Sequence, residues 1–141
     1  MTRRKRPDAC QTRRGALVVD DEPVVLDVIT SALTSAAEFQ VIQARTAEEA
    51  RSLFDTHAAD LCVAIVDIRL AASNGVDFVR SLPTLIPRIP ILFMTGLGDR
   101  DVADLAPEDP VLYKPFTVNT LLQAVETVVS SAPQRSAKLL D

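Results

Sequence analysis

The sequence predicts an α/β protein built on a doubly wound, five-stranded parallel sheet. Short apolar runs alternate with segments whose apolar residues recur at helical spacing, in the order βαβαβαβαβα. Hydrophobic residues make up 48% of the 141 residues and aromatic residues only 4%, so Val, Leu, Ile and Ala must fill the core. This is the usual filling of a parallel sheet covered by helices on both faces, and right-handed crossovers produce that arrangement.

Five apolar runs are predicted to be the strands of this sheet. The third run is apolar throughout, which is typical of a central strand. In chain order, the strands are expected at Ala16–Val19, Phe39–Ala44, Leu61–Val66, Ile91–Met94 and Val111–Tyr113.

The first two helices have clear start signals. Pro23 stands near a first helical turn, where its missing N–H costs nothing, and apolar residues follow it at helical spacing as far as Leu33. Thr46 and Glu49 form a capping box, which predicts a helix over Ala47–His57.

Three further helices are predicted after the third strand. A third helix is expected over Val76–Leu82. Pro107 and Pro110 interrupt the fourth connection, so its helix around Val102–Leu105 should be short and irregular. A final helix is expected after the capping residue Thr117.

Charge divides the chain into an arm, one domain and a tail. The first 14 residues carry six basic side chains against Asp8 alone, about +5, and because the net charge is −4 the remainder carries about −9. We expect a basic flexible arm over residues 1–14, a domain over 15–130 and a polar tail over 131–141. A basic arm on an acidic body could contact nucleic acid or an acidic membrane, but a solvated tail is the plainer interpretation.

Composition argues against several other classes of protein. Cys10 lies in the arm and Cys62 in an apolar strand, which is neither a disulfide framework nor a metal-binding spacing and fits a reducing cytoplasm. The basic N-terminus lacks the apolar stretch of a secretory signal. No apolar run approaches the roughly 18 residues of a membrane span. We therefore expect a cytoplasmic protein without membrane insertion.

Polar side chains stand where four of the predicted strands end. The C-terminal ends of parallel strands lie along one edge of a sheet, where open α/β sheets bind their ligands. The sequence therefore predicts that three carboxylates, a hydroxyl and an ammonium meet in one crevice. They are Asp20 and Asp21 after the first strand, Asp67 after the third, Thr95 after the fourth and Lys114 after the fifth.

The three carboxylates predict a metal site. Crowded carboxylates repel one another, and a hard divalent cation relieves that cost. Mg²⁺ prefers six oxygen ligands, a few from carboxylates and the rest from waters and a phosphoryl oxygen. We expect Asp21 and Asp67 to bind Mg²⁺, with Asp20 acting directly or through water. The backbone carbonyl of Arg69, two residues after Asp67, could point into the same site.

Such a site suits phosphoryl transfer. The attacked phosphorus needs in-line geometry and neutralisation of the charge on its equatorial oxygens. Asp67 ends the central strand and is the best-placed nucleophile, since carboxylates serve this role through aspartyl-phosphate intermediates. Lys114 offers a positive charge to one phosphoryl oxygen and Thr95 a hydroxyl to another. Gly96 leaves room beside the incoming group.

Four motifs stand in this order along the chain: LVVDDEP, IVDIRL followed by Asn74–Gly75, FMTG and YKPF. Together they resemble the response-regulator receiver domain of two-component signalling, over about residues 15–130. The resemblance implies a flavodoxin-like fold in which Asp67 accepts a phosphoryl group from a phosphohistidine of a histidine kinase or histidine phosphotransfer protein. It also implies metal binding by Asp20 and Asp21, a switch through Thr95 and a cis Lys114–Pro115 bond.

The chain departs from the family pattern in three places. Ala71 stands where a proline usually follows the acceptor by four residues. Val111 stands at the position of the usual switch aromatic, and Tyr113 next to the lysine would share its face. The span from Thr95 to Lys114 is short. The usual coupling of threonine to an aromatic residue is therefore in question.

The sequence thus predicts a stand-alone response regulator rather than an enzyme. Only about 11 residues follow the predicted domain, so the output would be a protein contact, a phosphoryl shuttle or a phosphoryl sink, with a homodimer possible. Three alternatives are open: a phosphatase with a nucleophilic Asp, a nucleic-acid-associated protein that uses the basic arm, and an adaptor that binds partners unphosphorylated. The adjacency of Asp20 and Asp21 fits the phosphatase poorly, and no recognition motif supports nucleic-acid binding.

Overall fold

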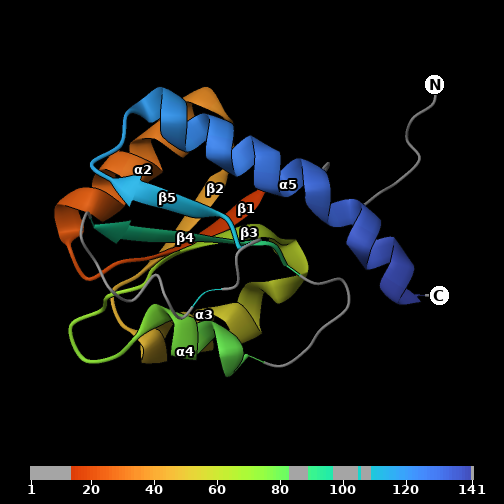
Figure 1. The fold of residues 1–141 in the computed structure, drawn as a ribbon, viewed down its shortest axis with the longest axis horizontal. Helices are drawn as coiled ribbons and strands as arrows, with labels where there is room; N and C mark the ends of the chain where they lie inside the picture. Colours follow the sequence, from red (N-terminus) through yellow and green to blue (C-terminus); the bar gives the residue numbers. More distant parts are fainter. Residues whose placement is uncertain (1–13, 83–88, 97–104, 106–108, 141) are drawn as a thin grey trace.

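The computed structural model describes residues 14–82, 89–96, 105 and 109–140. Its sheet has five parallel strands in the order β2-β1-β3-β4-β5, so β3 is central as the sequence predicts (Figure 1). The strands are β1 (Gly15–Val19), β2 (Gln40–Ala44), β3 (Leu61–Asp67), β4 (Ile91–Gly96) and β5 (Val111–Lys114).

Helices cover both faces of the sheet. On one face lie α2 (Pro23–Ala36) and α5 (Val118–Leu140), and on the other α3 (Ala47–His57) and α4 (Gly75–Arg80), with a short 3₁₀ turn η1 (Ala58–Asp60) before β3 (Figure 1). The doubly wound α/β fold is confirmed.

Side chains of β3 alternate between two apolar cores, one on each face of the sheet. Ile65 packs in the core formed with α2 and α5, and its neighbour Val66 packs in the core formed with α3 and α4. All seven residues of β3 are buried, which explains its unbroken apolar sequence. Burial of both faces fixes the register of β3 and therefore the position of Asp67, its last residue.

Local signals begin the helices largely as predicted. Pro23 is the first residue of α2. The Thr46 hydroxyl accepts a hydrogen bond of 3.0 Å from the Glu49 N–H at the start of α3, while the Glu49 carboxylate accepts one from the Arg45 N–H at 2.9 Å. The capping box is confirmed, with the reciprocal bond displaced by one residue to Arg45. At α4, Asn74 is the cap, because its Oδ1 accepts from two backbone N–H groups of the first turn.

Two expected boundaries differ from the structure. Helix α5 continues to Leu140 and projects beyond the sheet, where the sequence predicted a polar tail over residues 131–141 (Figure 1). Arg14, expected in the flexible arm, is held at the start of β1: its carbonyl accepts from the Gln40 N–H at 2.7 Å. Its guanidinium pairs with Glu126 of α5 at 2.5 Å and lies 4.3 Å from the ring centroid of Phe39.

Other predictions fall on residues that the structure does not describe. These are the remainder of the basic arm and the irregular fourth helix around Val102–Leu105, of which Leu105 alone is described. Within the described part of the chain, no helix is both long and apolar enough to cross a membrane.

Candidate functional site

Parallel pairing places three carboxylates at one edge of the sheet. Strands β1 and β3 are neighbours whose ends pair Val19 with Val66, so Asp20 and Asp67 lie side by side. One carboxylate oxygen from each of Asp20, Asp21 and Asp67 lies within 4.8 Å of the others. Asp20 is fully buried and Asp67 is 5% exposed, while Asp21 is half-buried. The predicted acidic cluster is therefore present, although the sequence did not predict that Asp20 would be the most deeply buried member.

Lys114 reaches this cluster from β5, with β4 between it and the central strand. Its ammonium lies 2.7 Å from Asp67 Oδ2, 2.9 Å from Asp20 Oδ2 and 3.5 Å from Glu22 Oε1. The Lys114–Pro115 peptide bond is cis, as the family resemblance implied. The structure thus brings together residues 20, 67 and 114, which are far apart in the sequence.

Backbone groups orient the two buried carboxylates. The Arg69 N–H donates to Asp67 Oδ1 at 2.9 Å, and the Glu22 N–H donates to Asp20 Oδ1 at 2.8 Å. Each carboxylate therefore has one oxygen held by the backbone and the other directed at Lys114. These contacts fix the orientation of both carboxylates.

Burial and charge shift the proton affinities of this pair. Burial raises the pKa of the Asp67 carboxyl from 3.8 to about 6, and nearby Asp20 adds to the rise, while hydrogen bonds from Lys114 and the Arg69 backbone oppose it. Burial by itself would lower the pKa of Lys114, but hydrogen bonds and charge from Asp67 and Asp20 outweigh it and the pKa is raised. Lys114 is therefore a cation at neutral pH, and Asp67 is a carboxylate that carries its charge at a cost.

Thr95 and Gly96 lie at the end of β4, the strand between β3 and β5. Thr95 is fully buried, and its hydroxyl lies 3.4 Å from the Gly96 carbonyl oxygen. Gly96 pairs with Lys114 across β4 and β5, and a Cβ added to Gly96 would meet none of the described residues within 4 Å. The role of Gly96 in leaving room beside an incoming group stays a prediction.

The residues of β5 next to the lysine differ from the family pattern in their burial. Val111, at the usual aromatic position, is half-buried and packs against the core on the α3 and α4 side. Tyr113 is 49% exposed, while Leu112 between them is buried on the opposite face. The prediction that Val111 and Tyr113 share a face agrees with this alternation, and Tyr113 is not a buried replacement for the missing aromatic.

The structure also places three other residues that bear on the sequence analysis, Arg69, Cys62 and Glu22. Arg69 is exposed at the mouth of the crevice, and Cys62 is buried in the core. The contact of Glu22 with Lys114 was missed, although the DDE sequence placed a third acidic residue beside the two chosen ones.

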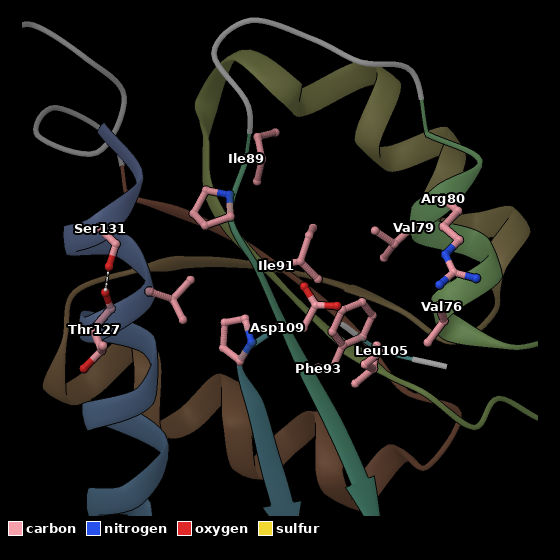
Figure 2. A pocket seen from close by; sticks show the side chains of 13 residues that line it. Val76, Val79, Arg80, Ile89, Ile91, Phe93, Leu105, Asp109, Thr127 and Ser131 are labelled. Atoms are coloured by element: carbon pink, nitrogen blue, oxygen red, sulfur yellow. Dashed lines mark hydrogen bonds between the residues drawn. The ribbon is translucent and has the colours of Figure 1, made fainter. Parts of the chain in front are cut away.

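A hollow of about 650 Å³ lies at the opposite edge of the sheet (Figure 2). It borders Ile91 at the beginning of β4 and Asp109 and Pro110 just before β5, whereas the acidic cluster lies at the C-terminal ends of the strands. Its walls come from three elements: Val76 and Val79 of α4, Phe93 of β4, and Thr127 and Val128 of α5. The hollow is therefore separate from the candidate site.

The fold and the acidic crevice together define a receiver module of two-component signalling. The family model described as response regulator receiver domain matches residues 16–126, and the chain belongs to this family. Receiver domains are phosphoacceptor signalling modules that bind Mg²⁺ through acidic residues and receive phosphoryl groups from histidine kinases.

Solved structures agree with this assignment. A response regulator receiver protein from Sinorhizobium medicae is 27% identical, with a TM-score of 0.75, and the match covers 86% of this chain and 98% of that one. A receiver domain protein from Clostridium thermocellum is 28% identical, with a TM-score of 0.73 over 91% and 99% of the two chains.

Curated relatives are longer proteins. The heme response regulator HssR of Staphylococcus saprophyticus is 30% identical over 80% of this chain and 50% of its own length. The response regulator protein PilR of Pseudomonas aeruginosa is 31% identical over 84% of this chain and 26% of its own length. The chain thus spans half or less of these relatives, and their complete activities do not transfer to it.

Proposed function

We propose that Asp67 accepts a phosphoryl group from a phosphohistidine on a histidine kinase or histidine phosphotransfer protein. The observation that carries this proposal is the position of the Asp67 carboxylate, within the acidic cluster and 2.7 Å from the ammonium of Lys114. A carboxylate in this setting is a nucleophile with a cation beside it, which is what attack on an anionic phosphoryl group requires.

In the proposed step, Asp67 Oδ2 attacks the phosphorus and a new O–P bond forms. The P–N bond to the imidazole breaks, and its electron pair stays on the ring nitrogen, which takes a proton from solvent. Lys114 already contacts Oδ2, so it is placed to balance the charge of the transferred oxygens. Thr95, buried at the end of β4, would donate its hydroxyl to one of them once the group is in place.

Magnesium fits the acidic cluster. In an octahedral centre with Mg–O distances of about 2.1 Å, ligand oxygens lie about 3–4 Å apart. The oxygens of Asp20, Asp21 and Asp67 lie within 4.8 Å of one another, so a small contraction or one bridging water would satisfy this geometry. Asp21 and Asp67 would bind the ion, with Asp20 direct or through water and the Arg69 carbonyl as a further ligand. Bound Mg²⁺ would neutralise phosphoryl charge and orient the group for in-line attack.

Apolar side chains beside the crevice support docking of a protein donor. Val24 and Val28 of α2 are 72% and 46% exposed, and Val118 at the start of α5 is 47% exposed. Together with Pro115 and Phe116, the two α2 valines line a hollow of about 400 Å³ next to Lys114. An apolar surface next to a reactive carboxylate suits a partner that presents its phosphohistidine from an apolar helix face.

The acyl phosphate would then shift the equilibrium between two conformations and change contacts with a partner protein or a second copy. We propose in the same way that the protein acts in the cytoplasm as a stand-alone regulator, a phosphoryl shuttle or a phosphoryl sink. The size of the natural polypeptide in its host tests the stand-alone role, since a longer product with an output domain would contradict it.

The central test uses small phosphodonors and intact-protein mass spectrometry. With phosphoramidate and Mg²⁺, the protein should gain one phosphoryl group, and Asp67→Asn should gain none. Asp55→Asn, which removes an exposed carboxylate on α3, is the matched control and should be labelled like the unmodified protein. Labelling that persists in Asp67→Asn would overturn the assignment, and sustained turnover of a phosphomonoester would favour the phosphatase.

A further inference from the structure

The ammonium of Lys114 is surrounded by three carboxylates. A lysine ammonium has three N–H donors, and the three neighbours are Asp67 at 2.7 Å, Asp20 at 2.9 Å and Glu22 at 3.5 Å. A phosphoryl oxygen that binds Lys114 must therefore replace one of these contacts or share its donor.

Glu22 is the contact that can be replaced. Asp20 is fully buried and has its other oxygen fixed by a backbone N–H, and Asp67 is the acceptor itself. The Glu22 carboxylate makes the longest of the three contacts, and its side chain is 62% exposed, so it can turn into solvent without losing buried contacts.

The position of Glu22 in the chain leaves its side chain available for this role. Glu22 directly precedes α2, and its backbone N–H donates a hydrogen bond to Asp20 Oδ1. Its side chain makes no capping hydrogen bond to the helix, and the helix begins with Pro23. The carboxylate therefore has no capping function in α2 that its movement would disturb.

We propose that Glu22 is a positioning residue that occupies the third donor of Lys114 until a phosphoryl oxygen displaces it. Its charge competes with the phosphoryl group for the ammonium, so Glu22 slows phosphorylation of Asp67 and weakens binding of the transferred group. This inference rests on the proposed acceptor role of Asp67 and assigns Glu22 the function of setting how readily that site is filled.

The test compares Glu22→Gln with the unmodified protein and with Asp27→Asn, an exposed carboxylate further along α2. At saturating Mg²⁺, phosphorylation is followed by intact mass with acetyl phosphate, which releases acetate as its P–O bond breaks, and with phosphoramidate, which releases ammonia. At low salt, Glu22→Gln should raise the second-order rate constant about two- to five-fold for both donors, the range expected for an exposed ion pair. High salt should remove most of this gain, because it screens the exposed pair. Asp27→Asn should change neither rate.

The outcomes separate this inference from the proposed function. Equal rates for Glu22→Gln and the unmodified protein at low salt would overturn the role of Glu22 and leave the acceptor intact. A gain with the more highly charged acetyl phosphate alone would also overturn it, because general repulsion depends on donor charge whereas competition for Lys114 does not. A gain that persists unchanged at high salt would indicate a structural effect and contradict the proposal. Failure of the unmodified protein to be labelled at Asp67 by either donor would instead overturn the proposed function.

Discussion

At the scale of single residues, the Asp67 carboxylate carries its charge at the expense of stability. It is 5% exposed and lies beside another buried carboxylate, Asp20. The ammonium of Lys114 offsets only part of the cost of ionising it, since the pKa of Asp67 stays raised at about 6. The fold therefore accommodates the Asp67 side chain more easily when it is neutral.

This balance predicts that Asp67→Asn stabilises the protein in the presence of a chelator. Because the folded pKa of about 6 lies above the ordinary 3.8, the destabilising contribution of Asp67 is fully present above pH 6 and disappears as the pH falls toward 4. At pH 7.5 we expect the variant to gain about 1–2 kcal/mol in the free energy of unfolding, with the gain shrinking toward zero near pH 4. Urea unfolding followed by circular dichroism measures it, since the chain has no Trp.

Magnesium provides the control for this prediction. At a given concentration, a ligand stabilises the folded form that binds it more tightly to a greater extent, so Mg²⁺ should stabilise the unmodified protein more than Asp67→Asn and reduce or reverse the difference. A variant that is less stable than the unmodified protein at pH 7.5 without metal would contradict the prediction.

Most residues of the candidate site could be predicted because each stands at the end of an apolar run. Asp20, Asp67 and Lys114 follow strands whose C-terminal ends must share one edge, so topology alone brings them together. The approach of Glu22 to Lys114 could not be predicted, because it depends on the direction of one side chain at the beginning of α2. The burial of Asp20 likewise depends on packing that the sequence pattern does not contain.

At the scale of elements, the start of α4 packs directly against the backbone of Asp67. A Cβ added to Gly75 would lie 2.0 Å from the Asp67 carbonyl oxygen, whereas one added to Gly96 would meet none of the described residues within 4 Å. The Gly75 N–H also donates to the Ile68 carbonyl at 2.7 Å. Glycine at position 75 is therefore required by close contact between α4 and the end of β3.

This contact predicts opposite results for two glycine substitutions. Gly75→Ala should lower the free energy of unfolding by about 2 kcal/mol or more, because the backbone at Asp67 has to move. Gly96→Ala should change it by less than about 0.5 kcal/mol, because none of the described residues would contact the added methyl group. Urea unfolding at pH 7.5 checks both predictions. Equal stabilities for the two variants would contradict a close contact between the start of α4 and the end of β3.

Helix starts were easier to predict than helix ends. Thr46 and Pro23 act through neighbours within one turn, so their signals are visible in the sequence. Helix α5 runs on to Leu140, past Ser130, Ser131 and Pro133, which are residues that disfavour helix continuation. The cap at Asn74 was not predicted, although Asn is a common capping residue.

At the scale of the whole molecule, Arg14, the residue before β1, connects the N-terminal edge of the sheet to α5. The Arg14 guanidinium pairs with Glu126 of α5 at 2.5 Å and lies over the Phe39 ring just before β2. These contacts connect residues 112 positions apart, at the opposite edge from Asp67. They should therefore contribute to the stability of the fold without taking part in phosphoryl chemistry.

A double-mutant cycle on Arg14 and Glu126 tests this division of roles. Arg14→Met should cost about 1–1.5 kcal/mol and Glu126→Gln about 0.5 kcal/mol, because arginine loses its stacking on Phe39 as well as the partly exposed ion pair. The coupling between the two changes should be about 0.5 kcal/mol, measured by urea unfolding, and should fall with added salt. Phosphorylation of Asp67 by phosphoramidate should proceed at the same rate in all four proteins. The rates are measured without urea, at a temperature at which Arg14→Met is fully folded. A slower rate in Arg14→Met would show that the two edges of the sheet are coupled and that the contact between Arg14 and Glu126 influences Asp67.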